Sequence, residues 1–260
     1  MNFESIRRVV VKVGTSSLTH PTGELHLRNM DKLVRAISDL QNEGYQIILV
    51  TSGAIGVGMS KLGMKQRPDD IRLKQAAAAV GQCELMHIYD KFFLDYGQVM
   101  GQILFTHDDI DGEKRRESLV GTLKAMLEVG AIPVINENDA VGVEEILFGD
   151  NDSLSAEVAV LADADLLVLF SDIDGLYDKD PHKNPDAKII PLVTEVNEAL
   201  YALAGGAGTK LGTGGMTTKL HAAEIAMEHN IPMVITNGNR FDALYEIVDG
   251  EISGTLFERA

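Results

Sequence analysis

Two lysines stand where the chain could do chemistry on a phosphate group. Lys12 ends an apolar run of valines, where an ammonium group is costly to bury unless an anion pairs with it. Lys219 follows the glycines and threonines of residues 212–218, which lead into a helical pattern. Exposed backbone N–H groups, hydroxyl donors and a helix N-terminus are the parts of a phosphate cradle. The plainer alternatives are a lysine whose stem packs while its head reaches water, and a flexible surface loop.

Four more polar stretches follow apolar runs. Residues 14–17 and 52–58 are small, hydroxyl-bearing and glycine-rich, which suits close approach of an anion to the backbone, although both could simply be tight turns. Residues 136–139, with 149–152, gather carboxylates and amides that could bind a zwitterion or organise lysines and a metal–nucleotide. Turn formation and helix capping are the alternative. Residues 171–177 follow another strand pattern. With the two lysines, these stretches predict a phosphoryl-transfer site.

Other common chemistries find no support. The sequence contains no G-x-x-x-x-G-K-[ST], G-x-G-x-x-G, G-x-S-x-G or H-E-x-x-H pattern, which argues against a P-loop nucleotidase, a dinucleotide-dependent oxidoreductase, a serine hydrolase and a zinc peptidase. The seven histidines show no metal-ligand spacing, and we expect His107 and His221 to be ordinary surface or core residues.

Elements that could position these stretches alternate between strand and helix patterns. Apolar runs bounded by turn signals predict strands at residues 7–13, 45–51, 99–105, 131–136, 165–170 and 232–236. Helical periodicity predicts helices at residues 30–40, within 71–96, and at 118–129, 152–162 and 216–230. The glycine-rich residues 205–215 are expected to form a loop. This alternation predicts an α/β fold with a mainly parallel sheet.

The simplest organisation is one domain over residues 1–260. We expect an N-terminal lobe to about residue 162 and a C-terminal lobe over about 163–260, sharing one sheet. Ligands of such open sheets bind in the crevice at the carboxyl ends of the strands, where the polar stretches fall.

Composition limits the partners and the compartment. The chain has 260 residues, with 23 basic and 39 acidic side chains and a net charge of −16, so we expect no nucleic-acid partner and no attraction to anionic lipid. No apolar run approaches the roughly 18 residues that span a membrane, and no export segment is visible. The single cysteine, Cys83, excludes an internal disulfide and fits a reducing compartment, so a cytoplasmic location is expected.

Five strings spread over almost the whole chain resemble the amino acid kinase family, and most closely its members that phosphorylate glutamate. They are Val-Lys-Val-Gly-Thr-Ser-Ser at 11–17, Thr-Ser-Gly-Ala-Ile-Gly-Val-Gly at 51–58, Pro-Val-Ile-Asn-Glu-Asn-Asp-Ala-Val at 133–141, Phe-Gly-Asp-Asn-Asp-Ser-Leu-Ser-Ala at 148–156 and Gly-Thr-Gly-Gly-Met-Thr-Thr-Lys at 212–219.

The resemblance implies a three-layer αβα sandwich around a mainly parallel sheet of about eight strands. It also implies a transferase, a kinase that moves the γ-phosphoryl group of ATP, with Mg²⁺, to the γ-carboxylate of L-glutamate. The product would be L-glutamyl 5-phosphate, the first intermediate of proline biosynthesis. An ionised carboxylate is already a nucleophile, so the reaction needs no general base.

Roles carried over by the resemblance fall on the stretches already described. Lys12 and Lys219 would neutralise the transferring phosphoryl group, and Asp152 would hold both ammonium groups. Substrate binding falls on Ser52, Gly53, Asp139 and Asn151. ATP binding falls on Lys12, Gly14, Ser171, Asp172, Thr213, Gly214, Gly215, Met216, Thr217, Thr218 and Lys219, and no residue is assigned directly to the metal.

The resemblance carries some further expectations. Many relatives have an additional C-terminal PUA domain, whereas this chain ends at Ala260, so we expect a short form without it. Proline is expected to inhibit, and a homodimer or homotetramer is implied. Ser171 stands where threonine is common, and it retains the hydroxyl. Residues 108–116 are expected to form either a mobile loop near the substrate entrance or a solvated turn.

Alternatives within the same fold are kinases of N-acetylglutamate, aspartate, carbamate or UMP. The clusters at 136–139 and 149–152 favour glutamate, because they suit a free amino acid with its ammonium intact. A non-catalytic nucleotide or amino acid sensor would require loss of a phosphate-handling lysine, and both are present.

Overall fold

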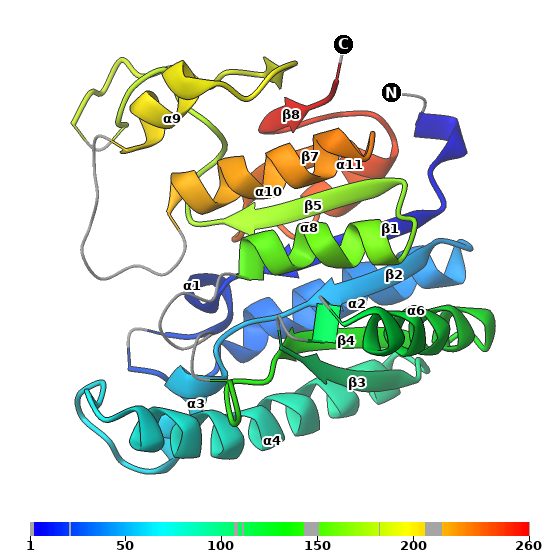
Figure 1. Ribbon diagram of the computed structural model, residues 1–260, viewed down its shortest axis with the longest axis vertical. Helices are drawn as coiled ribbons and strands as arrows, with labels where there is room; N and C mark the ends of the chain where they lie inside the picture. Colours follow the sequence, from blue (N-terminus) through cyan, green and yellow to red (C-terminus); the bar gives the residue numbers. More distant parts are fainter. Residues whose placement is uncertain are drawn as a thin grey trace.

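Eight strands form one sheet in the computed structural model, which describes residues 3–20, 22–106, 109–110, 112–142, 151–181, 183–205 and 215–259 (Figure 1). The strand order is β3-β4-β2-β1-β5-β7-β8-β6, and every pairing is parallel except β7 with β8. The strands are β1 Arg8–Val13, β2 Gln46–Val50, β3 Met100–Phe105, β4 Ile132–Glu137, β5 Leu166–Ser171, β6 Leu192–Val193, β7 Met233–Asn237 and β8 Thr255–Phe257.

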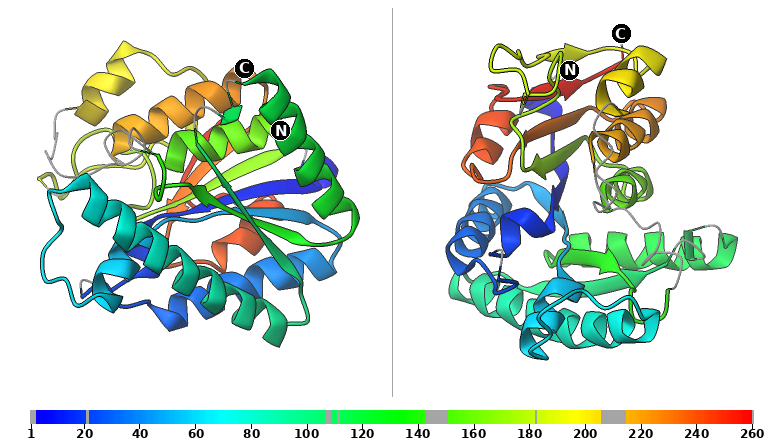
Figure 2. Two further views of the ribbon diagram at one scale, coloured as in Figure 1. Left: turned by 60° about the horizontal axis from the view of Figure 1, so that its bottom comes forward. Right: turned by 90° about the vertical axis from the view of Figure 1, so that its left-hand side faces the viewer.

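Helices cover both faces of this sheet (Figure 2). Beside the short 3₁₀ turn η1 Phe3–Ser5, the helices are α1 Thr15–Leu18, α2 Leu27–Asn42, α3 Ala54–Lys61, α4 Ile71–Asp95, α6 Glu113–Glu128, α8 Asn151–Leu161, α9 Glu198–Gly205, α10 Met216–Glu228 and α11 Ala243–Val248. One core cluster joins α1, α2, α4 and α11 to the sheet, and the other joins α6, α8 and α10 to its opposite face. The architecture is therefore the expected three-layer αβα sandwich.

The central strands are apolar on both faces because both faces are covered. In β1, Val9 and Val11 belong to one core cluster and Val10 to the other, and all three are fully buried. β1 pairs with β2 on one side and β5 on the other, so it has no exposed edge. Continuous β-branched runs of this kind are typical of parallel strands buried on both faces.

Most predicted elements are confirmed, with boundaries shifted by a residue or two. The helix expected from residue 118 begins earlier, at Glu113, so the loop or turn expected over 108–116 is wrong for its second half. Asp109 accepts hydrogen bonds from the backbone N–H of Thr106 and from the Arg115 side chain of α6. The loop expected at 205–215 lies mostly outside the described residues, apart from Gly205 and Gly215.

Short elements at one edge were not predicted. β6 and β8 have two and three residues, too few for a periodic pattern, and α11 has only six. Of the described helices, none is long and apolar enough to cross a membrane.

Candidate active site

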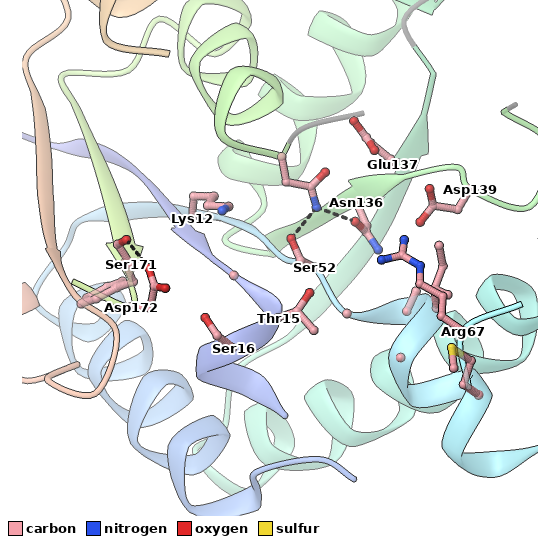
Figure 3. Close-up of a pocket in the computed structure, with 18 of the residues that line it drawn as sticks. Lys12, Thr15, Ser16, Ser52, Arg67, Asn136, Glu137, Asp139, Ser171 and Asp172 are labelled. Carbon is pink, nitrogen blue, oxygen red and sulfur yellow. Dashed lines mark hydrogen bonds between the residues drawn. The ribbon is translucent and has the colours of Figure 1, made fainter. Parts of the chain in front are cut away.

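A cavity of about 370 Å³ opens where four neighbouring parallel strands end (Figure 3). It is lined by Lys12 at the end of β1, Ser52 just after β2, Asn136 near the end of β4 and Ser171 at the end of β5. Because these strands run parallel and side by side, their carboxyl ends meet at one edge of the sheet. The sequence-based expectation of a crevice at this edge is confirmed.

Asp152 joins the two predicted lysines beneath the cavity. Its Oδ1 atom lies 2.5 Å from Lys12 Nζ, and its Oδ2 atom lies 2.9 Å from Lys219 Nζ. Asp152 is fully buried, and the lysine side chains are 8% and 7% exposed. Thr218 donates a hydrogen bond of 2.8 Å to Oδ2 of the same carboxylate. One carboxylate therefore holds two ammonium groups that come from opposite ends of the chain.

The charge balance of this cluster is positive. Burial alone would raise the pKa of the Asp152 carboxyl, but the charges and hydrogen bonds of Lys12 and Lys219 outweigh burial and hold that pKa well below its usual range. The carboxylate is therefore ionised at neutral pH. Two cations against one anion leave a net charge of +1 at the cavity floor, which an incoming phosphate group can neutralise.

A chain of amides connects α8 to the sheet. Asn151 Nδ2 donates to Ser52 Oγ at 2.7 Å and to Asn136 Oδ1 at 3.0 Å, and it also contacts the Thr51 carbonyl oxygen at 2.7 Å. Asn136 in turn donates to Gln82 Oε1 of α4 at 2.8 Å. These hydrogen bonds fix the Asn151 side chain. Its buried Oδ1 atom has no hydrogen-bond partner in the described residues, so this oxygen can accept a hydrogen bond from a ligand.

The cavity has two chemically different ends. Near Lys12, its wall consists of Gly14, Thr15 and Ser16 after β1, of Ser171 at the end of β5 and of Asp172 just after it. At the other end lie the carboxylates of Glu137 and Asp139 and the guanidinium of Arg67, which Figure 3 draws on the side away from Ser171. The middle is formed by the start of α3, whose N-cap Gly53 has a φ of +102° that favours glycine.

Most predicted site residues line this cavity. Those that do are Lys12, Gly14, Ser52, Gly53, Asp139, Asn151, Ser171, Asp172 and Lys219. Asp152 lies below the cavity and acts on it through the lysines. Gly215, Met216 and Thr217 open α10 without lining it, and Met216 packs against a core cluster. Thr213 and Gly214, like Gly149 and Asp150 of the acidic cluster and His107, lie outside the described residues.

Sequence analysis did not single out two features of the site. Arg67 lies in the connection between α3 and α4, where no periodicity or motif marks it. Gln82 is polar within an otherwise ordinary helix, and its role follows only from its bond to Asn136. Nothing in the sequence separates Arg67 from Lys65, which lies in the same connection but does not line the cavity. By contrast, His221 is exposed, as expected.

The arrangement suits transfer of a phosphoryl group to a carboxylate. The described residues contain no group of three or more histidine, cysteine or acidic side chains placed to hold a metal ion. The cavity offers cations and backbone N–H groups at the Lys12 end, and carboxylates, amides and one guanidinium at the other. These groups are chemically suited to a phosphate at the first end and to an amino acid at the second.

Comparison with known proteins agrees with this geometry. The sequence profile of the amino acid kinase family matches residues 7–237. A glutamate 5-kinase of Clostridium acetobutylicum is 56% identical over 98% of this chain and 96% of its own length. A glutamate 5-kinase of Carboxydothermus hydrogenoformans is 52% identical over 98% of this chain, which spans 68% of that protein.

Solved structures share the fold at low sequence identity. A UMP kinase from Bacillus anthracis superposes with a TM-score of 0.67 at 16% identity, covering 97% of this chain and 96% of the other. An isopentenyl phosphate kinase gives a TM-score of 0.66 at 15% identity over 96% of this chain and 100% of the other. At these identities the likeness concerns the fold alone, whereas the sequence profile covers all the residues that line the cavity. The chain belongs to the amino acid kinase family.

Proposed function

We propose that this protein is an ATP-dependent kinase that phosphorylates the γ-carboxylate of L-glutamate to L-glutamyl 5-phosphate, the first step of proline biosynthesis. The observation that carries the proposal is the cluster of Lys12, Asp152 and Lys219 at the floor of a cavity. The far end of this cavity has the carboxylates and guanidinium that suit an amino acid. The 56% identity to a protein named glutamate 5-kinase over nearly the full length of both chains supports the substrate.

Lys12 and Lys219 have the catalytic role in this proposal. An oxygen of the γ-carboxylate attacks the γ-phosphorus of ATP and forms a new P–O bond. The bond from that phosphorus to the β,γ-bridging oxygen breaks, and its electron pair leaves with ADP. The obstacle is repulsion between anions, which two buried ammonium groups offset. Asp152 holds both ammonium groups in place.

The polar middle and far end of the cavity position the amino acid. Ser52 and Asn151 are held by their mutual hydrogen bond and face the cavity, where they can bind a carboxylate and an N–H group. Asp139 supplies negative charge for the α-ammonium group, and Gly53 lets backbone N–H groups of α3 approach the substrate. These groups bind and orient the acceptor, and no general base is required.

ATP occupies the end formed by Gly14, Ser171 and Asp172, to which α10 contributes Lys219. Thr213 and Gly214 lie outside the described residues and stay among the proposed ATP-binding residues. The donors there fit phosphate oxygens: Lys12 presents its ammonium group, and Gly14 lies beside it, since a Cβ atom at that position would be in ordinary contact with Nζ at 3.7 Å. Mg²⁺ arrives with ATP and neutralises part of the charge on its phosphates when bound. Asp172 is the carboxylate of this end that could face it.

Several finer expectations belong to the same proposal and rest on the resemblance. The N-terminal lobe, to about residue 162, binds glutamate, and the C-terminal lobe, from about 163, binds the nucleotide. Proline inhibits by competing at the glutamate end, the assembly is a homodimer or homotetramer, and the protein works in the cytoplasm. Proline inhibition is tested by varying glutamate at fixed proline, where competition raises KM and leaves kcat unchanged.

Measuring ATP-dependent acyl phosphate formation tests the main proposal. Hydroxylamine traps the acyl phosphate while ADP release is followed, with L-glutamate, aspartate, N-acetylglutamate, carbamate and UMP compared as acceptors. We expect turnover with glutamate alone. A preference for another acceptor would overturn the substrate, and no turnover with any of the five would favour a sensor.

The same assay tests the lysines. Lys219→Ala and Lys12→Ala are each expected to lower kcat about 10²–10³-fold, or about 3–4 kcal/mol of transition-state stabilisation. Lys124→Ala is the matched control, because Lys124 is 49% exposed and pairs with Asp163 at the surface. Nearly normal turnover by Lys219→Ala would contradict its role.

A further inference from the structure

The cationic side chains that line the cavity differ in whether they already pair with a carboxylate. Among the described lining residues, they are Lys12, Lys219 and Arg67. Both lysines are bound to Asp152. Arg67 has no carboxylate within ion-pair distance in the described part of the chain, and its side chain makes no hydrogen bond there. Its guanidinium is therefore available to an anionic ligand that enters the cavity.

Arg67 also lies at the correct end for one particular anion. Figure 3 shows its guanidinium directed toward the side of the cavity where Asn136 and Asp139 lie, whereas Lys12 lies at the other side of Ser52. The proposed reaction places the γ-carboxylate of glutamate beside the lysines. The opposite end of the same molecule carries an α-ammonium and an α-carboxylate, so both of these groups fall near Asp139 and Arg67.

The charged side chains near Asp139 and Arg67 distinguish the α-ammonium of the acceptor from its α-carboxylate. Glu137 and Asp139 are carboxylates, which attract the α-ammonium and repel the α-carboxylate. Of the described side chains at this end, Arg67 is the cation that can offset that repulsion. A guanidinium presents a planar fork of donors that matches a carboxylate with two parallel hydrogen bonds.

We propose that Arg67 binds the α-carboxylate of the acceptor and selects acceptors that carry one. The inference rests on the proposed function, because it assumes an amino acid whose distal carboxylate is phosphorylated. Arg67 is a specificity residue in this account. It contacts the unreactive end of the substrate, so its loss weakens acceptor binding and leaves the chemical step at saturation largely intact.

Two analogues separate the two ends of the substrate. 4-Aminobutanoate lacks the α-carboxylate and keeps the ammonium, whereas glutarate keeps both carboxylates and lacks the ammonium. Inhibition constants against glutamate measure the binding of each analogue whether or not it reacts. In Arg67→Gln we expect KM for glutamate and the inhibition constant of glutarate to rise about 10–100-fold, with KM for ATP unchanged. The inhibition constant of 4-aminobutanoate is expected to change less than threefold.

Two further variants keep the test decisive. Lys65→Gln removes a cation from the same connection without touching the cavity, and all constants are expected to stay at their wild-type values. Arg67→Lys keeps the charge without the fork and is expected to fall between wild type and Arg67→Gln. Equal weakening of glutarate and 4-aminobutanoate in Arg67→Gln, or no weakening of either, would overturn the inference while the wild-type reaction stood. A wild-type protein that does not phosphorylate glutamate would overturn the proposed function and this inference together.

Discussion

At the scale of single residues, Asp152 couples catalysis to stability. It is fully buried and bonded to two lysines from distant parts of the sequence, at positions 12 and 219. Breaking a buried ion pair by removing one partner is costly, because it leaves uncompensated charge in the interior. Here, loss of the Asp152 carboxylate would leave the ammonium groups of Lys12 and Lys219 close together without an anion between them. The same contacts that position the lysines for the proposed phosphoryl transfer therefore also hold β1, α8 and α10 together.

Asp152→Asn tests this coupling through the pH dependence of stability. The pKa of Asp152 in the folded protein lies below the unfolded value of about 3.9, so its contribution is fully present above that value and is lost as pH falls through the acid range. We expect Asp152→Asn to lower the free energy of unfolding by about 3–5 kcal/mol at pH 7. Between pH 5 and 3, urea unfolding of the wild type should lose stability more steeply than that of the variant.

Asp186→Asn provides the matched control for that experiment. Asp186 also accepts a lysine hydrogen bond, from Lys179 at 2.6 Å, but its side chain is 78% exposed. Exposed ion pairs contribute about 0–1 kcal/mol, so the free energy of unfolding of this variant should remain close to that of the wild type at pH 7 and between pH 5 and 3. Equal acid slopes for the wild type and Asp152→Asn would show that the buried carboxylate does not titrate on unfolding as argued.

At the scale of elements, the site depends on how closely α3 approaches α4. Gly58 of α3 and Gly81 of α4 face each other across this contact. A Cβ atom at Gly81 would lie 1.8 Å from the Ala54 carbonyl oxygen, and one at Gly58 would lie 1.7 Å from the Ala77 carbonyl oxygen. Neither backbone oxygen can move aside without moving its helix. The glycines therefore fix the position of the α3 N-terminus, which lines the cavity through Ala54.

Gly81→Ala should separate the two helices and disturb the acceptor end of the site. We expect the free energy of unfolding to fall by about 1–3 kcal/mol, as in other overpacked interiors, and KM for glutamate to rise more than KM for ATP. Chemical denaturation and steady-state kinetics measure the two effects. Gly121→Ala is the control: a Cβ atom at this α6 position meets nothing within 4 Å, so alanine should stabilise by about 0.5–1 kcal/mol. A neutral or stabilising Gly81→Ala would contradict the close contact.

The elements that could be predicted are those whose burial leaves a periodic pattern. β1 and β5 are continuously apolar and α2 is strongly amphipathic, so their positions follow from sequence. α3 could not be predicted, because its sequence Ala-Ile-Gly-Val-Gly-Met has two glycines that weaken a helix and are explained only by the contact with α4. β6 and β8 owe their existence to pairing at the sheet edge, which a two- or three-residue pattern cannot encode.

The site was predictable to the extent that its residues follow strands. Lys12, Ser52 and Ser171 lie at strand ends, and the parallel order of the sheet brings strand ends together. The pairing of Lys12 with Lys219 through Asp152 needed the resemblance to a family, because the sequence alone does not say which acidic residue lies between them. Arg67 needed the structure, since its place depends on the path of the connection from α3 to α4.

At the scale of the whole molecule, the two proposed binding regions share one continuous sheet. β1 pairs with β2, which leads to the proposed acceptor end, and with β5, which leads to the proposed nucleotide end. Both core clusters include residues from both proposed lobes: one joins Leu33 to Leu244, and the other joins Leu123 to Leu220. A division at about residue 162 therefore separates binding regions without separating cores.

Hydrogen exchange in the presence of each ligand tests this division. Glutamate should slow amide exchange at the start of α3 and around the end of β4, whereas a non-hydrolysable ATP analogue should slow it over residues 171–177 and at the start of α10. β1 should be strongly protected with or without ligands, because it is buried on both faces and paired on both edges. α11 lies away from the cavity and serves as the internal control, with no change expected from either ligand.

If glutamate instead protected residues 171–177 and left α3 unchanged, the two binding regions would be assigned to the wrong lobes. The proposed role of Lys12 and Lys219 in neutralising the transferring phosphoryl group would stand, because Asp152 fixes both ammonium groups whichever lobe binds glutamate.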